Sequence, residues 1–196
     1  MSIITLVEFT DYLRNEIGAQ DVTHTSSALA AAEQALNEAC ARNWTVAGAS
    51  SARIYSPDCR SSILRIHDCT TITSVVESSS TVNAADYQAQ PNNHLSWSGQ
   101  AEPYQELLRL NGVEWYWSYG LATVTVTAAW GWLAIPSQIV EACKVIGKTL
   151  VELRNARGGV VASDVFGPVR SPRDVTGQVG SLIDRRLRRA EAFGIA

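Results

Sequence analysis

The chain has 196 residues, of which 46% are hydrophobic and 18% are charged, and its formal net charge is −3. This length supports one core, or a core with a small satellite, and the hydrophobic fraction excludes a natively disordered chain. No run approaches the roughly 18 apolar residues of a membrane span, so no membrane partner is expected.

The charge distribution and the cysteines indicate what the protein binds and where it is made. Residues 157–196 carry seven arginines and four acidic residues, whereas the rest of the chain carries nine basic and fifteen acidic residues, a net charge of −6. Such an acidic body repels a phosphate backbone, which argues against a DNA-binding body. Residues 1–9 lack the basic and apolar blocks of a signal peptide, and no cysteines have C-x-x-C spacing. We therefore expect free thiols and synthesis in the cytoplasm.

Two helices are predicted in the first part of the chain. Thr5 and Glu8 fit a capping box ahead of residues 6–17, where apolar residues follow at helical spacing. After a polar connector over 18–26, a second helix is predicted over 27–42 from the spacing of its apolar residues, which are Leu29, Ala32, Ala35, Leu36, Ala39 and Cys40. Because alanine lets helices approach closely, this composition suits a bundle or a subunit contact better than a ligand pocket.

A β-rich insert is predicted over residues 52–130. Short runs with strand-like character alternate there with clusters of Ser, Asn, Pro and Gly. The expected strands cover residues 52–56, 62–67, 72–77, 86–90, 107–110 and 121–130. Gly131 then breaks the last strand, and Pro136 suits the first turn of a long amphipathic helix over 136–157.

The C-terminal part is predicted to be a tether and a short helix. Residues 158–180 contain five glycines and two prolines, which is typical of a flexible linker. Residues 181–196 follow as a helix with an apolar side (Leu182, Ile183 and Leu187) and a basic side (Arg185, Arg186, Arg188 and Arg189). A solvated face, phosphate contact, an anionic membrane surface and an acidic protein groove all fit this pattern. A linker followed by a short amphipathic helix favours docking to a protein.

In chain order these elements predict an α+β fold. N-terminal helices and one long central helix pack with a small antiparallel β-rich region, and a linker and a short helix follow. The predicted organisation is a core over residues 1–157, a flexible linker over 158–180 and a docking helix over 181–196.

No residue pattern predicts catalysis, a cofactor or a metal. His67, Asp68 and Cys69 are adjacent, but in a strand His67 and Cys69 would share a face with no third group to orient the base. The three histidines and four cysteines lack the spacing of zinc ligands. Gly158 and Gly159 follow a helix rather than opening one around a phosphate. We therefore expect a protein without enzymatic activity.

Aromatic residues gather in and just after the β-rich insert, where five of the six tryptophans lie: Trp97, Trp115, Trp117, Trp130 and Trp132. Three interpretations fit, namely a small β core, a subunit interface, or a ledge that stacks on sugars or bases. The core interpretation is favoured. The candidates for a subunit interface are Trp115, Trp117, Trp130 and Trp132.

Several packing patterns recur together across residues 1–157. They are an alanine-rich helix with Ala32, Glu33 and Leu36 before Arg42 and Trp44; Ile72 to Val75 followed by Asp86 and Tyr87; Leu108 to Leu110 before Trp115; and Val124 to Val126 leading through Trp130 and Gly131 to Pro136 and Ala142. In this order they resemble the head-tail connector, or adaptor, proteins of long-tailed bacteriophages.

The resemblance implies a structural protein of the virion neck, made in the host cytoplasm. Proteins of this family form a ring of identical subunits, usually a dodecamer, below the portal, and DNA passes through the hole without sequence-specific binding. The implied partners are further copies of the chain, the portal protein, and a neck stopper or tail-completion protein. The C-terminal helix is expected to dock to the portal or an adjacent subunit. Two alternatives stay open: a carbohydrate-binding module that uses the clustered tryptophans, and a different neck or tail-completion ring protein.

Overall fold

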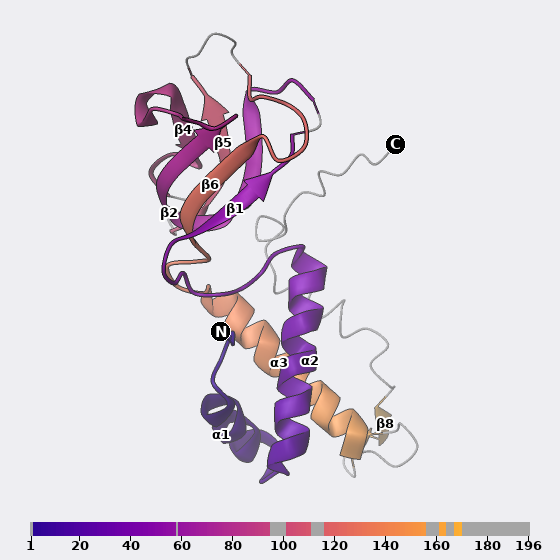
Figure 1. Ribbon diagram of the computed structural model, residues 1–196. Helices are drawn as coiled ribbons and strands as arrows, with labels where there is room; N and C mark the ends of the chain where they lie inside the picture. Colours follow the sequence, from indigo (N-terminus) through magenta and orange to yellow (C-terminus); the bar gives the residue numbers. More distant parts are fainter. Residues whose placement is uncertain are drawn as a thin grey trace. The chain divides into compact units, whose positions relative to one another are not determined.

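Helices and strands occupy separate stretches of the chain in the computed structural model (Figure 1). The structure describes residues 2–57, 59–94, 101–110, 116–155, 161–163 and 167–169. Within these residues it has three α-helices and an antiparallel sheet of six strands, so the predicted α+β class is confirmed. The chain divides into a helical unit, Met1–Trp44 with Ile135–Ala196, and a sheet unit, Thr45–Ala134.

The helical unit contains α1 (Leu6–Ile17), α2 (Val22–Cys40) and α3 (Ser137–Asn155). The predicted capping box is present at the start of α1. The Thr5 hydroxyl accepts the amide of Glu8 at 3.2 Å, and the Glu8 carboxylate accepts the amide of Thr5 at 2.9 Å. The bonds from Thr5 lower the pKa of Glu8, because they favour its charged form.

The helix bounds differ from the prediction at α2. This helix starts at Val22 rather than at residue 27, because the Asp21 carboxylate accepts the amides of Thr23 and His24 at 2.9 and 3.1 Å and caps it there. It ends at Cys40 rather than at residue 42, because the next residue adopts a left-handed conformation that ends the helix. For α3, predicted over 136–157, the described helix is Ser137–Asn155.

Small residues allow the three helices to pack closely. α2 packs along α3, and α1 contacts both (Figure 1). On α2 the inward side includes Ala28 and Ala32, and on α3 it includes Gly147. A Cβ atom on Gly147 would lie 2.5 Å from Cζ of Phe9, so only glycine lets the Phe9 ring sit this close to the α3 backbone.

The sheet unit is built on β1 (Ser51–Tyr55), β2 (Ile63–Glu77), β3 (Ser80–Thr81), β4 (Tyr87–Gln90), β5 (Tyr104–Arg109) and β6 (Val124–Trp130). The strands pair antiparallel in the order β1-β6-β2-β5-β4, and β3 pairs with the end of β2. β6 alternates strictly between buried and half-buried residues, as its predicted period of two requires.

The main difference from the prediction in this unit is β2. Strands were expected at 62–67 and 72–77, whereas the structure has a single strand of 15 residues. The two predicted halves do differ in their partners, because the first half pairs with β5 and the second pairs with β6. The pairing register shifts between Arg65 and Cys69, and such a bulge removes the alternation by which a strand is recognised in sequence.

Side chains and a neighbouring loop satisfy the backbone where β2 changes partner. The Tyr55 hydroxyl accepts the amide of His67 at 3.1 Å. The carbonyl of Asp68 accepts the amide of Gly131 at 2.8 Å. These bonds replace the ladder pairs that the register shift removes, so the strand continues through the bend.

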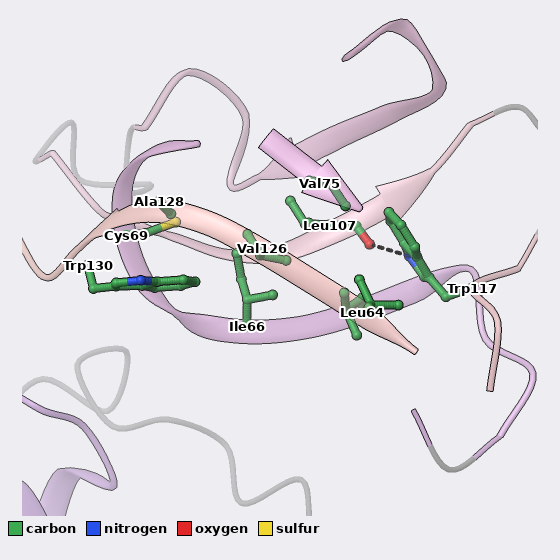
Figure 2. Packing of buried hydrophobic residues seen from close by; sticks show 10 residues of the cluster. Leu64, Ile66, Cys69, Val75, Leu107, Trp117, Val126, Ala128 and Trp130 are labelled. Atoms are coloured by element: carbon green, nitrogen blue, oxygen red, sulfur yellow. Dashed lines mark hydrogen bonds between the residues drawn. The ribbon is translucent and has the colours of Figure 1, made fainter. Parts of the chain in front are cut away.

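The core of the sheet unit gathers side chains from both halves of β2 and from β5 and β6 (Figure 2). The cluster consists of Leu64, Ile66, Cys69, Val75, Leu107, Trp117, Val124, Val126, Ala128 and Trp130. The indole of Trp117 closes one side of the cluster, and its Nε1 donates to the Leu107 carbonyl at 3.1 Å (Figure 2). A large ring from outside the strands thus adds buried apolar area to this core.

Two further strands, β7 (Val161–Ser163) and β8 (Gly167–Val169), pair antiparallel within the stretch predicted as a flexible linker. This pairing does not test whether residues 158–180 act as a linker, so that stays a prediction. The rest of 158–180 and all of the predicted helix 181–196 lie outside the described residues. Of the helices that the structure describes, none has the length and apolar character needed to cross a membrane.

Candidate functional site

His67, Asp68 and Cys69 do not form a nucleophilic site. The register shift in β2 turns Cys69 inward, at 0% exposed, while His67 is exposed, so the expectation that they share a face is wrong. Burial raises the pKa of Cys69 to about 12, which keeps its thiol protonated at neutral pH. Nδ1 of His67 lies 2.9 Å from the Tyr55 hydroxyl instead. The trio therefore offers no activated thiolate.

Metal ligands do not converge in the part of the chain that the structure describes, where no three His, Cys, Asp or Glu side chains form a group that could hold an ion. In the helical unit, Cys143 is 0% exposed, and burial raises the pKa of its thiol to about 12. A thiol that stays protonated is a poor zinc ligand, since zinc binds the thiolate.

The tryptophans that the structure describes in and after the insert lie in the interior. Trp117 and Trp132 are each 1% exposed, and Trp130 is 8% exposed. Nε1 of Trp130 donates to the Ser51 carbonyl at 2.8 Å, as that of Trp117 does to Leu107. The burial of the three rings, with bonded nitrogens on Trp117 and Trp130, favours the core interpretation over a sugar-binding ledge. A contact of these three with a neighbouring subunit stays a prediction, and Trp97 and Trp115 lie outside the described residues.

The predicted docking residues of the C-terminal segment also lie outside the described residues: Leu182, Ile183, Arg185, Arg186, Leu187, Arg188 and Arg189. Their role therefore stays a prediction. The described surfaces on which a partner could bind belong to the helical unit and the sheet unit.

α2 presents one such surface. While Ala28, Leu29, Ala32 and Leu36 are buried, the opposite side of the helix is exposed and carries mostly small, uncharged side chains. We call this side the α2 outer face, and it consists of Ser26, Ser27, Ala30, Ala31, Gln34, Ala35, Glu38 and Ala39. The alanines on the buried side of α2 pack within the helical unit, and a subunit contact by the exposed ones stays a prediction.

An exposed apolar loop between β5 and β6 was missed by the sequence interpretation, which placed Leu121 at the start of a strand. Leu121 is 91% exposed and Tyr119 is 53% exposed. Gly120 donates its amide to the Pro57 carbonyl at 2.8 Å, which fixes the loop, and Ala122 adopts a positive φ of 55°. Gly120 was the one local signal for a turn here, since a positive φ at alanine leaves no mark in sequence.

Comparison with known proteins gives matches to solved structures, whereas no protein-family model and no curated protein matches the chain. A chain in the neck of an empty gene transfer agent particle, computed with C6 symmetry, aligns over 98% of this chain and 92% of its own, with 17% identity and a TM-score of 0.58. This fold occurs in the neck of gene transfer agent particles. A chain of the native gene transfer agent virion gives a TM-score of 0.54, with 18% identity over 98% of this chain and 92% of its own. A chain from the native neck, computed with C12 symmetry, gives 0.52, with 16% identity over 96% and 90%.

The similarity to gene transfer agent neck chains spans both units, because each alignment covers at least 96% of this chain. At 16–18% identity the fold is what is shared. The surfaces of this chain must therefore be judged on its own residues.

Proposed function

We propose that this chain is a structural protein of a virion neck, a head-tail connector whose copies form a ring below the portal, join the capsid to the tail, and let DNA pass. The observation that carries the proposal is the fold, which aligns over nearly the whole chain with chains from gene transfer agent necks that were computed with C6 and C12 symmetry. Both symmetries are compatible with a dodecamer, which is the ring we propose.

The chemistry of the described residues agrees with an architectural role. The thiols at Cys69 and Cys143 are buried and protonated, so they provide no nucleophile. The chain outside 157–196 carries a net charge of −6 and would repel rather than grip the phosphates of DNA in a channel. DNA would then move through the ring without sequence-specific binding.

Contacts between subunits need exposed surfaces that pack closely, and the α2 outer face is one. Its alanines and serines carry little side-chain entropy and leave the helix backbone accessible to a neighbour. For attachment to the portal we propose the C-terminal segment, with Leu182, Ile183 and Leu187 buried and the four arginines of 185–189 pairing with acidic groups. A neck stopper or tail-completion protein would bind the other side of the ring.

The ring is tested by imaging particles made in cells that carry the gene with a small C-terminal tag. We expect cryo-electron microscopy to show twelve copies in one ring at the portal. Absence of the chain from purified particles would reject a virion role. A ring found farther along the neck would instead identify the chain as a different neck or tail-completion protein, which is the alternative in the same setting.

The docking segment is tested with matched charge variants of Arg185, Arg186, Arg188 and Arg189. Replacing the four with Glu should weaken attachment to portals at least tenfold, whereas replacing them with Lys should weaken it much less, because lysine keeps the charge. Removal of residues 160–196 should abolish attachment. If the shortened chain attaches as well as the full chain, the segment is not the anchor.

The carbohydrate-binding alternative depended on exposed tryptophans. The burial of Trp117, Trp130 and Trp132 removes the described members of that ledge, so we do not propose this function. A glycan array with the purified chain is expected to give no binding above background.

A further inference from the structure

The sheet unit has an outer surface that carries no ionisable side chain among its paired residues. In β6, Val124, Val126 and Ala128 are buried, so Thr125 and Thr127 between them point to the opposite side. The cross-strand partners of these two threonines on β1 and β2 share that side. We call this surface the uncharged sheet face, and it consists of Ala52, Ile54, Ser74, Val76, Thr125 and Thr127.

This surface differs from the outer side of the other half of the sheet. There Arg65 pairs with Glu106 across β2 and β5, and their charged groups lie 3.4 Å apart, with the Arg65 side chain 54% and the Glu106 side chain 36% exposed. Charged side chains make up roughly 25–35% of an ordinary protein surface, so about two would be expected among six positions. On the uncharged sheet face Ile54 is 65% exposed instead.

The position of Ile54 adds a second feature. It lies on β1, which ends the strand order and pairs only with β6 among the described strands. Edge strands of monomers are commonly protected by charged side chains or proline. On the side of β1 that carries Ile54, the other residue is Ala52, so neither device is present there.

A second copy of the chain is the partner that this chemistry fits. Two bodies of net charge −6 repel each other wherever their charged surfaces meet, and an uncharged surface avoids that cost. A basic partner or DNA would be recognised by acidic or basic side chains respectively, and the face has neither. The α2 outer face is the matching surface on this same chain, since Glu38 is its one ionisable member.

On the basis of the proposed ring, we propose that the uncharged sheet face of one copy packs against the α2 outer face of the next. Each copy uses two different surfaces, and such head-to-tail contacts can close into a ring. Small helix side chains over a β-branched sheet form the helix-on-sheet layer that is common within domains. The uncharged sheet face has six residues and the α2 outer face has eight, fewer than the roughly 20–30 residues a side of a stable interface. A contact this small would be weak between free copies, so it suits a ring that closes only on its template.

The test places a negative charge on the face and then offsets it. In particles made with the variant gene, Thr125→Glu should lower incorporation of the chain at least tenfold. Ala85→Glu is the control, because Ala85 is exposed on the short turn Ala84–Asp86, outside the face. The double variant Thr125→Glu with Ala31→Lys should recover most of the incorporation, because the lysine of one copy faces the glutamate of the next.

A neutral pair of variants tests the contact without a buried charge. Ile54→Cys with Ala31→Cys, in a Cys59→Ser chain, should give a ladder of covalent oligomers when particles are oxidised, and circular dichroism of each purified variant reports its folding. Cys59 is replaced because it is exposed, whereas the other three cysteines are buried.

The outcomes separate this inference from the proposed function. A wild-type chain that is absent from neck rings rejects the proposed function and this contact together. If the wild type forms the ring and Thr125→Glu is incorporated equally well, only this contact is rejected. A Thr125→Glu defect that no lysine at positions 30, 31 or 35 offsets, with no covalent ladder, rejects α2 as the occupant.

Discussion

The helical unit and the sheet unit differ in one packing contact of each. Between the helices, small residues permit close approach, and the Phe9 ring lies where Gly147 leaves room for it. In the sheet unit a large indole, Trp117, packs into the core. The Gly147 position should therefore be sensitive to added atoms and the Trp117 position to removed ones.

The two kinds of packing leave different surfaces for assembly. Small inward residues on α2 come with small outward ones, so the same helix can pack inside its unit and against another chain. The sheet unit instead places its large residues inside, and part of its outer side is the uncharged sheet face. Both units thus keep their fold-stabilising groups away from the surfaces that we propose for contact between copies.

Of the substitutions predicted below, Trp117→Ala should lower the free energy of unfolding most. It removes one of the two tryptophan side chains of the Figure 2 cluster and the buried hydrogen bond to the Leu107 carbonyl. Replacing a buried tryptophan with alanine costs about 3–5 kcal/mol of unfolding free energy, which urea unfolding followed by near-ultraviolet circular dichroism would measure. Trp117→Phe should cost clearly less, because it keeps most of the volume. A loss below about 1 kcal/mol for the alanine variant, well under the cost of such a truncation, would contradict the role given to the indole.

Gly131→Ala tests whether the sheet unit also has a point of close approach. Gly131 has φ 122°, and a Cβ atom there would lie 2.5 Å from the Thr45 carbonyl oxygen. Left-handed strain of about 1–2 kcal/mol and overpacking of about 1–3 kcal/mol together predict a loss of roughly 3 kcal/mol. Gly48→Ala is the control, because a Cβ atom on Gly48 would meet no neighbouring group within 4 Å. Equal melting temperatures for the two variants would refute the close approach.

Gly147→Ala tests the close approach of the Phe9 ring to the α3 backbone in the helical unit. Alanine gains about 1 kcal/mol of helix propensity, but its Cβ would overlap the Phe9 ring, and overpacking costs about 1–3 kcal/mol. The overpacking cost exceeds the gain in helix propensity, so the free energy of unfolding should fall by about 1 kcal/mol. Thermal unfolding would measure this loss. In a Phe9→Leu chain, Gly147→Ala should leave the stability unchanged or raise it relative to Phe9→Leu alone, because the smaller leucine side chain removes the clash. If Gly147→Ala stabilises the wild-type chain, the contact is looser than the structure shows.

The helical unit could be predicted from sequence because its signals are local. The capping box of Thr5 and Glu8 and the period of the apolar residues place α1 where the structure has it. The start of α2 was missed, because Asp21 lies among polar residues that also suit a connector, and a cap is recognisable only once the helix is known to begin there.

The sheet unit was harder because its decisive features are not local. The bend of β2 depends on Tyr55 and Gly131, which are distant in sequence and satisfy its backbone from two other segments. The uncharged sheet face appears only when the register of β1, β6 and β2 is known, since its members come from three strands. Cys69 shows the same limit, because one register shift reversed the side to which it points.

The smallest expected effect concerns the Asp21 cap of α2 and its dependence on pH. The amides of His24 and Thr23 bond to the carboxylate and lower its pKa below the ordinary value of 3.8. A folded-state pKa below the unfolded one means that the cap stabilises the chain above pH 3.8, and that this contribution is lost as the pH falls through the lowered value.

Asp21→Asn isolates that contribution, because asparagine is also a good cap but does not titrate in this range. Between about pH 5 and pH 2 the wild type should lose more stability than the variant, as measured by urea unfolding at each pH. Glu8 titrates over a similar range, but it is present in both chains and cancels in the difference. Parallel stability curves for the two chains over this range would mean that the Asp21 charge is not coupled to the folding of α2.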